Sequence, residues 1–309
     1  MKNSPYLLLV LAPLFLSANF LIGKVIAGTV PPGALTFLRW LISFIVILPF
    51  FGRELLKNKI LFIKNWPLMI ILGLTGYFFN SLGTYLAVTY TTAINASFIA
   101  SLNPIAFALF GFVFYKEKAA PLQIIGIVIS LTGVLWIIFK GNIADILSMR
   151  INSGDGFMLI AVISWAIYSN ILKKKEANFP WPAIFITLVF SGIIVSIPYV
   201  ILETSLQGWN WLGLLGAKDY LCILAVGIIP SLLAFYCWNK ALSHVESNQA
   251  AIFLNLIPVF TTILSIIIFK EELMYYHLLG GLLIFSGVLL VTNYQVLTRN
   301  IKARYAGGK

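Results

Sequence analysis

Long apolar runs, separated by short polar or glycine-containing turns, fill almost the whole chain. Their lengths are close to the roughly 20 residues that a helix needs to cross a bilayer core. They also lack the alternation of apolar and polar positions that is typical of a half-buried strand. The pattern predicts five helices in the first half, at 6–27, 34–51, 66–88, 93–115 and 121–139, and five in the second, at 156–172, 182–202, 220–238, 249–269 and 275–292.

Composition agrees with a membrane protein. The chain has 309 residues, of which 60% are hydrophobic and 10% are charged, whereas soluble domains carry about 25% charged residues. The first apolar run continues to Ala27 and is longer than the core of a secretory signal, which favours a retained first helix. We therefore expect an all-α, polytopic membrane protein with ten transmembrane helices.

The net charge of +11 is distributed unevenly over the predicted loops. With the N-terminus inside, fifteen Lys and Arg residues fall on cytoplasmic segments and five outside, while Arg39 lies within the second helix. Since cytoplasmic loops carry the excess of Lys and Arg, both termini are expected in the cytoplasm. The basic excess predicts contact with anionic lipid headgroups rather than nucleic acid, in a bacterial cytoplasmic membrane.

The two halves resemble each other when the sequence is shifted by 154 residues. The matched pairs are Ala87 and Ala241, Pro104 and Pro258, Lys116 and Lys270, Glu117 and Glu271, Gly126 and Gly280, and Gly133 and Gly287. A weaker match at a shift of 151 pairs Asn19 with Asn170 and Pro31 with Pro182. These matches predict a five-helix repeat over 1–140, a linker over 141–155, a second five-helix repeat over 156–294 and a basic cytoplasmic tail over 295–309.

Because each repeat has an odd number of helices, the second repeat enters the membrane from the opposite side. Inverted repeats of this kind are typical of secondary transporters, whose substrate site lies near the bilayer midplane between the repeats. The fold expectation is therefore two inverted five-helix repeats.

The residues around Asn19, the Arg39 that follows Pro32, and the repeated Ala, Pro, Glu, Gly, Gly pattern resemble EamA-type members of the drug/metabolite transporter superfamily. The resemblance covers essentially the whole chain. It implies an exporter or exchanger of small metabolites, often amino acids, with a cavity formed by helices three, four, eight and nine and helped by one and six. The Trp that often precedes Asn19 in the family is missing here, although Trp165 stands before Asn170.

Polar side chains inside the predicted helices are the candidates for substrate binding, although buried amides also hold membrane helices together. They are Asn19, Asn80, Tyr85, Ser101, Asn103, Asn170, Tyr236, Asn239, Asn248 and Asn255. Pro104 and Pro258 lie within predicted helices and deprive the carbonyls of Ala100 and Leu254 of their usual donors. We expect both prolines to act as hinges, and the freed carbonyls to be able to accept a substrate ammonium.

Three charged residues are candidates for gating. Glu117 and Glu271 sit at repeat-related helix ends, where they either pin the helix to the headgroup zone or close salt bridges alternately at the two gates. Arg39 either snorkels to the outer surface or supplies a gating or anion-attracting charge. Gly126, Gly133, Gly280 and Gly287 are spaced seven apart within each helix, which predicts close helix packing.

The expected function is secondary transport of small neutral or zwitterionic metabolites, amino acids above all, by alternating access. The ten Asp and Glu residues all fall in predicted loops or at helix ends, and the sequence contains no phosphate-binding loop. We expect no catalytic residue, metal or cofactor. The alternative is a membrane-embedded enzyme acting on a lipid or polyprenyl substrate, with Lys240, His244 and Glu246 as acid–base groups.

Overall fold

The computed structural model describes residues 5–91, 93–116, 120–139, 141–142, 152–175, 178–269 and 274–306, and these residues form helices and turns with no strand. Six helices are long and apolar enough to cross a membrane, namely Pro5–Ile26, Pro32–Lys57, Trp66–Tyr90, Ser153–Lys175, Trp181–Gln207 and Ala217–Leu242. Shorter apolar helices cover Asn103–Phe114, Pro121–Ile137, Gln249–Leu264 and Tyr275–Leu290. The described part of the chain is therefore all-helical, and the length and apolar composition of its helices indicate an integral membrane protein.

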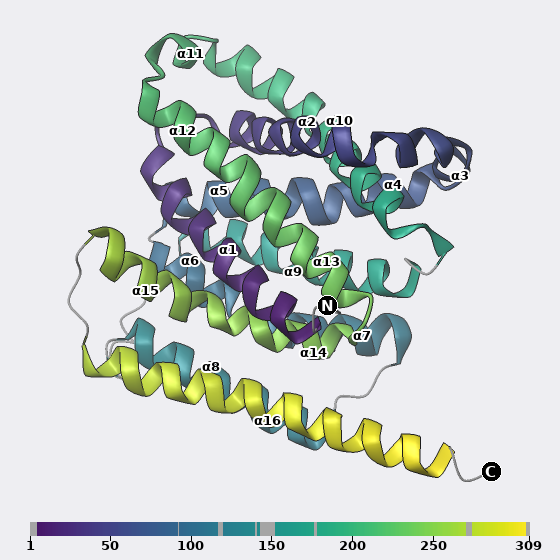
Figure 1. The fold of residues 1–309 in the computed structure, drawn as a ribbon. Helices are drawn as coiled ribbons and strands as arrows, with labels where there is room; N and C mark the ends of the chain where they lie inside the picture. The colour runs from purple at the N-terminus through teal and green to yellow at the C-terminus, as the bar shows by residue number, and fades with distance from the viewer. Residues whose placement is uncertain are drawn as a thin grey trace.

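The helices follow one another in a single bundle (Figure 1). The first half contains α1 (Pro5–Ile26), α2 (Pro32–Lys57), α3 (Lys59–Lys64), α4 (Trp66–Leu72), η1 (Gly73–Phe79), α5 (Asn80–Tyr90), α6 (Ala93–Ala100), α7 (Asn103–Tyr115) and α8 (Pro121–Ile138). The second half contains α9 (Ser153–Lys175), α10 (Trp181–Gln207), α11 (Trp211–Leu214), α12 (Ala217–Val226), η4 (Gly227–Leu233), α13 (Ala234–Leu242), α14 (Ser247–Ile252), η5 (Phe253–Asn255), α15 (Leu256–Phe269) and α16 (Tyr275–Ala306).

Two of the long helices contain a π-helical segment of seven residues. The segment η1 connects α4 to α5, and η4 connects α12 to α13. Both begin with a glycine in close contact with another helix: a Cβ atom at Gly73 would collide with Ser191 on α10, and one at Gly227 would lie 2.6 Å from Ile42 on α2. The two segments start 154 residues apart, which is the shift found in the sequence. Such π-helical insertions are frequent at functional sites.

Two predicted helices are broken near their prolines. The expected helix 93–115 is divided into α6 and α7 by a turn at Ser101 and Leu102, and Pro104 is the second residue of α7. In the second half, the 3₁₀ turn η5 separates α14 from α15, in which Pro258 is the third residue. A proline removes a hydrogen bond from the preceding turn, so the breaks lie where the sequence weakens the helix.

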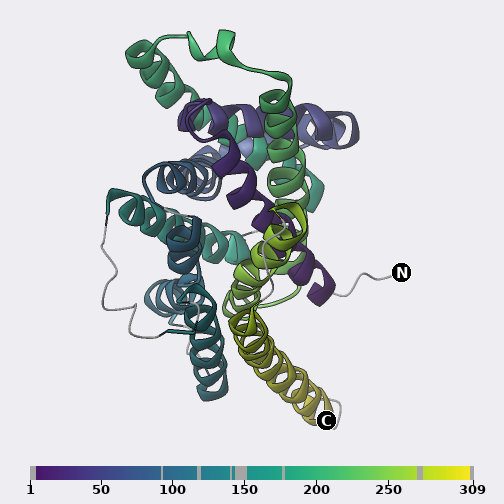
Figure 2. The same cartoon turned by 90° about the vertical axis from the view of Figure 1, so that its left-hand side faces the viewer.

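The helices α8 and α16 form an antiparallel pair along one edge of the molecule (Figure 1, Figure 2). A Cβ atom at Gly133 would lie 2.5 Å from the carbonyl oxygen of Gly280, and one at Gly287 would lie 2.5 Å from that of Gly126. The backbones approach this closely because no side chain stands between them, as expected for glycines at a membrane-helix interface.

The helices α2 and α10 pack against each other along their lengths. Their N-caps are Pro31 and Pro180, which lie 149 residues apart, and each helix has an internal proline, Pro49 or Pro198, at the same separation. At the starts of these two helices, Pro31 therefore corresponds to Pro180. The sequence comparison had matched Pro31 with Pro182. Helix α10 also extends past the predicted end at residue 202, so that Glu203 lies inside the helix.

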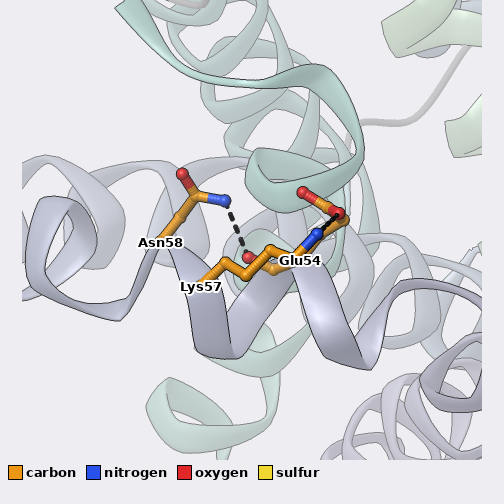
Figure 3. Close-up of polar contacts among 3 residues, drawn as sticks. All are labelled: Glu54, Lys57 and Asn58. Atoms are coloured by element: carbon orange, nitrogen blue, oxygen red, sulfur yellow. Dashed lines mark hydrogen bonds and ion pairs between the residues drawn. The ribbon is translucent and has the colours of Figure 1, made fainter.

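The C-terminal end of α2 is fixed by local contacts (Figure 3). Lys57 Nζ lies 3.1 Å from Glu54 Oε1, and the side-chain amide of Asn58 donates to the Glu54 carbonyl at 2.9 Å. A cation near the last turn also complements the negative end of the helix dipole. The chain then turns directly into α3.

Candidate functional site

Arg39 of α2 is the central charged group of the bundle and is only 2% exposed. Its Nε donates to Ser231 Oγ of η4 at 2.6 Å, and its Nη1 donates to the Tyr85 hydroxyl of α5 at 2.9 Å. A longer contact of 3.5 Å joins Nη1 to Asn19 Oδ1 of α1. The guanidinium therefore connects four elements, and it does not snorkel to the surface.

The partners of Arg39 are themselves held in place by further hydrogen bonds. The Tyr85 hydroxyl donates to Asn19 Oδ1 at 2.9 Å, and Ser231 Oγ donates to the Val226 carbonyl at 2.6 Å. The latter carbonyl lies five residues before Ser231, a spacing that the π-helical segment brings into reach. Each hydroxyl thus accepts a hydrogen bond from Arg39 and donates one to another acceptor, and these two bonds fix its orientation.

The charge of Arg39 is neutralised by no carboxylate in the described part of the chain. The one ion pair among those residues joins Lys57 and Glu54. The guanidinium also lies over the rings of Trp40 and Tyr85, with its central carbon 4.8 Å and 5.4 Å from the ring centroids. Ring faces and neutral oxygens stabilise a buried cation but leave its full charge in place.

A second buried polar group lies between η1, α9 and α13. The Tyr168 hydroxyl donates to Asn239 Oδ1 at 2.9 Å, and Asn239 Nδ2 donates to the Tyr77 hydroxyl at 3.5 Å. Tyr77 lies 154 residues before Ser231, and Asn239 lies 154 residues after Tyr85. The shift found in the sequence therefore relates two residues of this group to two partners of Arg39.

Aromatic rings fill the space between these polar groups. Trp40 lies 4.5 Å from Tyr77 and 4.7 Å from Phe235 between ring centroids. Trp165 lies 4.9 Å from Phe235 and 5.5 Å from Trp238. All five side chains are buried. Walls of this kind accept apolar or aromatic groups, while the few polar groups between them fix orientation.

Asn103 and Asn255 mark the two helix breaks. Asn103 Nδ2 donates to the Ala100 carbonyl at 2.7 Å. Pro104 leaves this carbonyl without a backbone donor, and we expected it to accept a hydrogen bond from the substrate. The Asn103 side chain occupies it instead. Asn255 Nδ2 donates to Ser130 Oγ of α8 at 3.0 Å. The Oδ1 atoms of both amides are buried and have no hydrogen-bond partner among the described residues.

Other predicted binding residues connect helices to one another. Asn80 Nδ2 donates to the Ala161 carbonyl of α9, and Asn170 Nδ2 donates to Phe107 of α7 and to Ala166 of its own helix. Ser101 donates to the Ser97 carbonyl one turn earlier. The bonds of Asn80 to Ala161 and of Asn170 to Phe107 are those of amides that hold membrane helices together, whereas the Ser101 bond is local to the end of one helix.

Tyr236 lies away from both polar groups, where its hydroxyl accepts from Lys240 Nζ at 3.0 Å and its ring packs against Trp181. The His244 ring nitrogen Nδ1 lies 3.0 Å from the Lys240 carbonyl in an exposed turn. The structure thus brings Asn19, Tyr85 and Arg39 into direct contact and places Tyr236 elsewhere.

Some predicted residues lie outside the part that the structure describes. These are Glu117, Glu271 and the side chain of Asn248. Conversely, sequence reasoning did not include Ser231 or Tyr168 among the site residues. The repeat shift applied to Tyr77 leads to Ser231, whereas Tyr168 carries no comparable signal.

A bundle of apolar helices with a buried cation and buried amides between its halves agrees with the class of polytopic membrane transporters. The profile of the EamA-like transporter family matches residues 3–139 and 152–293. The chain therefore belongs to the EamA-like transporter family.

Individual relatives agree with this assignment. An uncharacterized transporter from Archaeoglobus fulgidus is 27% identical over 297 residues, which cover 96% of this chain and 99% of the relative. The uncharacterized transporter YyaM of Bacillus subtilis is 26% identical, with 92% of each chain covered. A solved crystal structure superposes with a TM-score of 0.72 at 20% identity, covering 95% of this chain and 97% of that chain, which shows a shared fold.

Proposed function

We propose that this membrane transporter is a secondary transporter that exports or exchanges small neutral or zwitterionic metabolites, with amino acids as the main class, by alternating access. It acts in the cytoplasmic membrane with both termini inside the cell, as the distribution of Lys and Arg favours. Its role is transport and not catalysis. Six long apolar helices and four shorter ones among the described residues support the ten-helix topology that we propose.

The proposed architecture is an inverted repeat, and the α8–α16 pair supports it. Gly133 approaches Gly280, and its repeat mate Gly287 approaches Gly126, the repeat mate of Gly280. In a contact with two-fold symmetry, a residue i meets a residue j and the mate of i meets the mate of j. The two π-helical segments add support, because each touches a long helix of the other half. Inverted halves can rock about a central site and open it to one side at a time.

The observation that carries the substrate class is the buried charge of Arg39, whose hydrogen-bond partners among the described residues are all neutral. A guanidinium binds a carboxylate through two parallel, charge-assisted hydrogen bonds. The long 3.5 Å contact to Asn19 Oδ1 is the weakest of its bonds and the one that a substrate carboxylate replaces most readily. Buried acceptor oxygens at Asn103 and Asn255 suit an ammonium group, which is the second charge of a zwitterion.

A counterflow assay tests the proposal. Purified protein in proteoliposomes is loaded with one unlabelled amino acid, organic acid or nucleobase at a time, and uptake of the labelled compound is measured. We expect counterflow with amino acids that have apolar or aromatic side chains, and its loss in Arg39→Gln. Counterflow with nucleobases alone, or none from folded protein with any of the compounds, would contradict the proposal.

A further inference from the structure

Glu203 of α10 holds the N-terminal end of α2. We infer that this carboxylate is a proton-binding site, and that its protonation releases α2 from α10 and opens the end of the bundle that is predicted to face the cell exterior. The inference rests on the proposed alternating access, because it names the group through which a proton controls one of the two gates.

The contact between Glu203 and α2 uses both carboxylate oxygens. Gly33 N donates to Oε1 at 3.0 Å and Ala34 N donates to Oε2 at 2.9 Å, and Glu203 is 5% exposed. The first N–H groups of a helix have no partner within the helix, and its N-terminus favours negative charge. An ionised carboxylate supplied by α10 satisfies two of these donors at once.

The approach of the two helices depends on a glycine. A Cβ atom at Gly33 would lie 2.6 Å from Glu203 Oε2 and 2.6 Å from the Tyr199 ring. A side chain at position 33 would therefore displace the Glu203 carboxylate or the Tyr199 ring. The sequence provides the space in which the carboxylate reaches the backbone.

The surroundings of Glu203 contain few other titratable groups. Tyr199 on α10 interacts electrostatically with Glu203, and Tyr90 on α5 interacts with Tyr199. The neighbouring η1 contributes the Phe78 ring, which packs against Tyr199. Among the described residues, no Lys, Arg or His forms an ion pair with Glu203. The negative charge therefore depends on the two N–H groups of α2.

Protonation changes this contact directly. A carboxylate only accepts hydrogen bonds, whereas a carboxylic acid has one O–H donor. When Glu203 takes up a proton, one oxygen presents this O–H to an N–H group, so one hydrogen bond is lost and the charge that favours the helix end disappears. The contact holds α2 to α10 while Glu203 is ionised, and it weakens as the pH falls.

The opposite end of the same helix pair lacks this contact. The separation of 149 residues that relates Pro31 to Pro180 and Pro49 to Pro198 also relates Glu54 to Glu203. At this separation Pro182 and Ala183 correspond to Gly33 and Ala34, and Pro182 has no N–H to donate.

Glu54 instead pairs with Lys57, and its side chain is 35% exposed (Figure 3). The difference between Glu54 and Glu203 makes proton control specific to one end of the bundle.

Cysteine accessibility tests the inference without any substrate, so it remains decisive if the counterflow assay fails. Full-length protein with Cys222→Ser and Cys237→Ser receives one cysteine at Val30, which is 3% exposed beside the start of α2. The rate of maleimide labelling is measured in nanodiscs, where both faces are accessible, between pH 8 and pH 4.5. A cysteine at the exposed Ser205 corrects for the pH dependence of thiol reactivity.

Glu203→Gln mimics the protonated side chain at every pH, and Glu54→Gln is the matched control. We expect corrected labelling at position 30 to be at least fivefold faster in Glu203→Gln than in the parent at pH 8, and to rise in the parent on acidification. We expect it to be high at all pH values in Glu203→Gln and to follow the parent in Glu54→Gln. Labelling in Glu203→Gln that equals the parent, or parent labelling that does not change with pH, would overturn the inference.

Discussion

Arg39 of α2 and Ser231 of η4 are joined by a hydrogen bond of 2.6 Å, although they lie 192 positions apart in the chain. This bond connects the first half of the protein to the π-helical segment of the second half. The same guanidinium reaches Tyr85 and Asn19 in the first half. A single buried cation therefore joins the two halves of the chain.

Replacing Arg39 by Lys should reduce transport strongly, even though the charge is kept. The lysine ammonium is a compact point charge and cannot reproduce the planar fork that serves Ser231 and Tyr85 together. Hydrogen bonds to charged groups contribute about 1.5–3 kcal/mol each, so we expect counterflow to fall by about tenfold to hundredfold. Arg53→Lys, at an exposed position of α2, is the control, and equal counterflow in both variants would disprove the assignment.

Asn103→Ala and Asn255→Ala should lower transport while membrane insertion remains normal. Each substitution removes a buried Oδ1 that has no partner among the described residues, and each also removes a donor, to Ala100 or Ser130. Flux is measured at matched protein levels, with Asn58→Ala at the end of α2 as the control. Normal flux in both variants would exclude the two amides from the site.

The sequence predicted those features that depend on residue type and repeat spacing. Glycines in register predicted close helix packing, because a missing side chain has the same effect in any helix contact, and the structure shows this packing between α8 and α16. Pro104 predicted a weak point in its helix, because its ring removes a donor whatever surrounds it.

Features that depend on how distant helices cross could not be predicted. The repeat shift marks Ser231 only as the mate of Tyr77, and its contact with Arg39 exists only through the packing of α2 on η4. Glu203 was expected at a helix end, yet it caps another helix, because α10 is longer than its apolar run. The direction of a side chain such as Arg39, inward or toward the headgroups, is likewise decided by its neighbours.

Asn239→Leu should destabilise the protein by about 1–3 kcal/mol, because it removes two hydrogen bonds from a buried site, one donated by the Tyr168 hydroxyl and one accepted by the Tyr77 hydroxyl. Thermal unfolding in detergent measures the effect as a lower melting temperature. Asn210→Leu, at an exposed position of the chain, provides the comparison. A melting temperature equal to that of the parent would show that the Asn239 group contributes no stability.

Cysteines placed at Lys116 and at its repeat mate Lys270 should react from opposite faces of the membrane. The prediction follows from the inverted repeat, in which an odd number of helices separates the two positions. Lys116 is exposed and has a φ angle of 55° at the end of α7, while Lys270 lies outside the described residues. A membrane-impermeant maleimide applied to intact cells should label position 270 only. Labelling of both positions from one face would refute the inverted topology.

Gly133→Ala should lower stability much more than Gly281→Ala, although both glycines lie in the same helix pair. A Cβ atom at Gly133 would lie 2.5 Å from the Gly280 carbonyl oxygen, whereas one at Gly281 would meet nothing within 4 Å. A backbone carbonyl cannot move aside as a side chain can, so α8 and α16 would have to separate, and forced overpacking costs about 1–3 kcal/mol. Alanine has a higher helix propensity than glycine, so Gly281→Ala should leave the melting temperature unchanged or raise it.

Gly287→Ala, which meets the Gly126 carbonyl in the same way, should match Gly133→Ala. A similar melting temperature for all three variants would mean that the glycines do not set the distance between the helices.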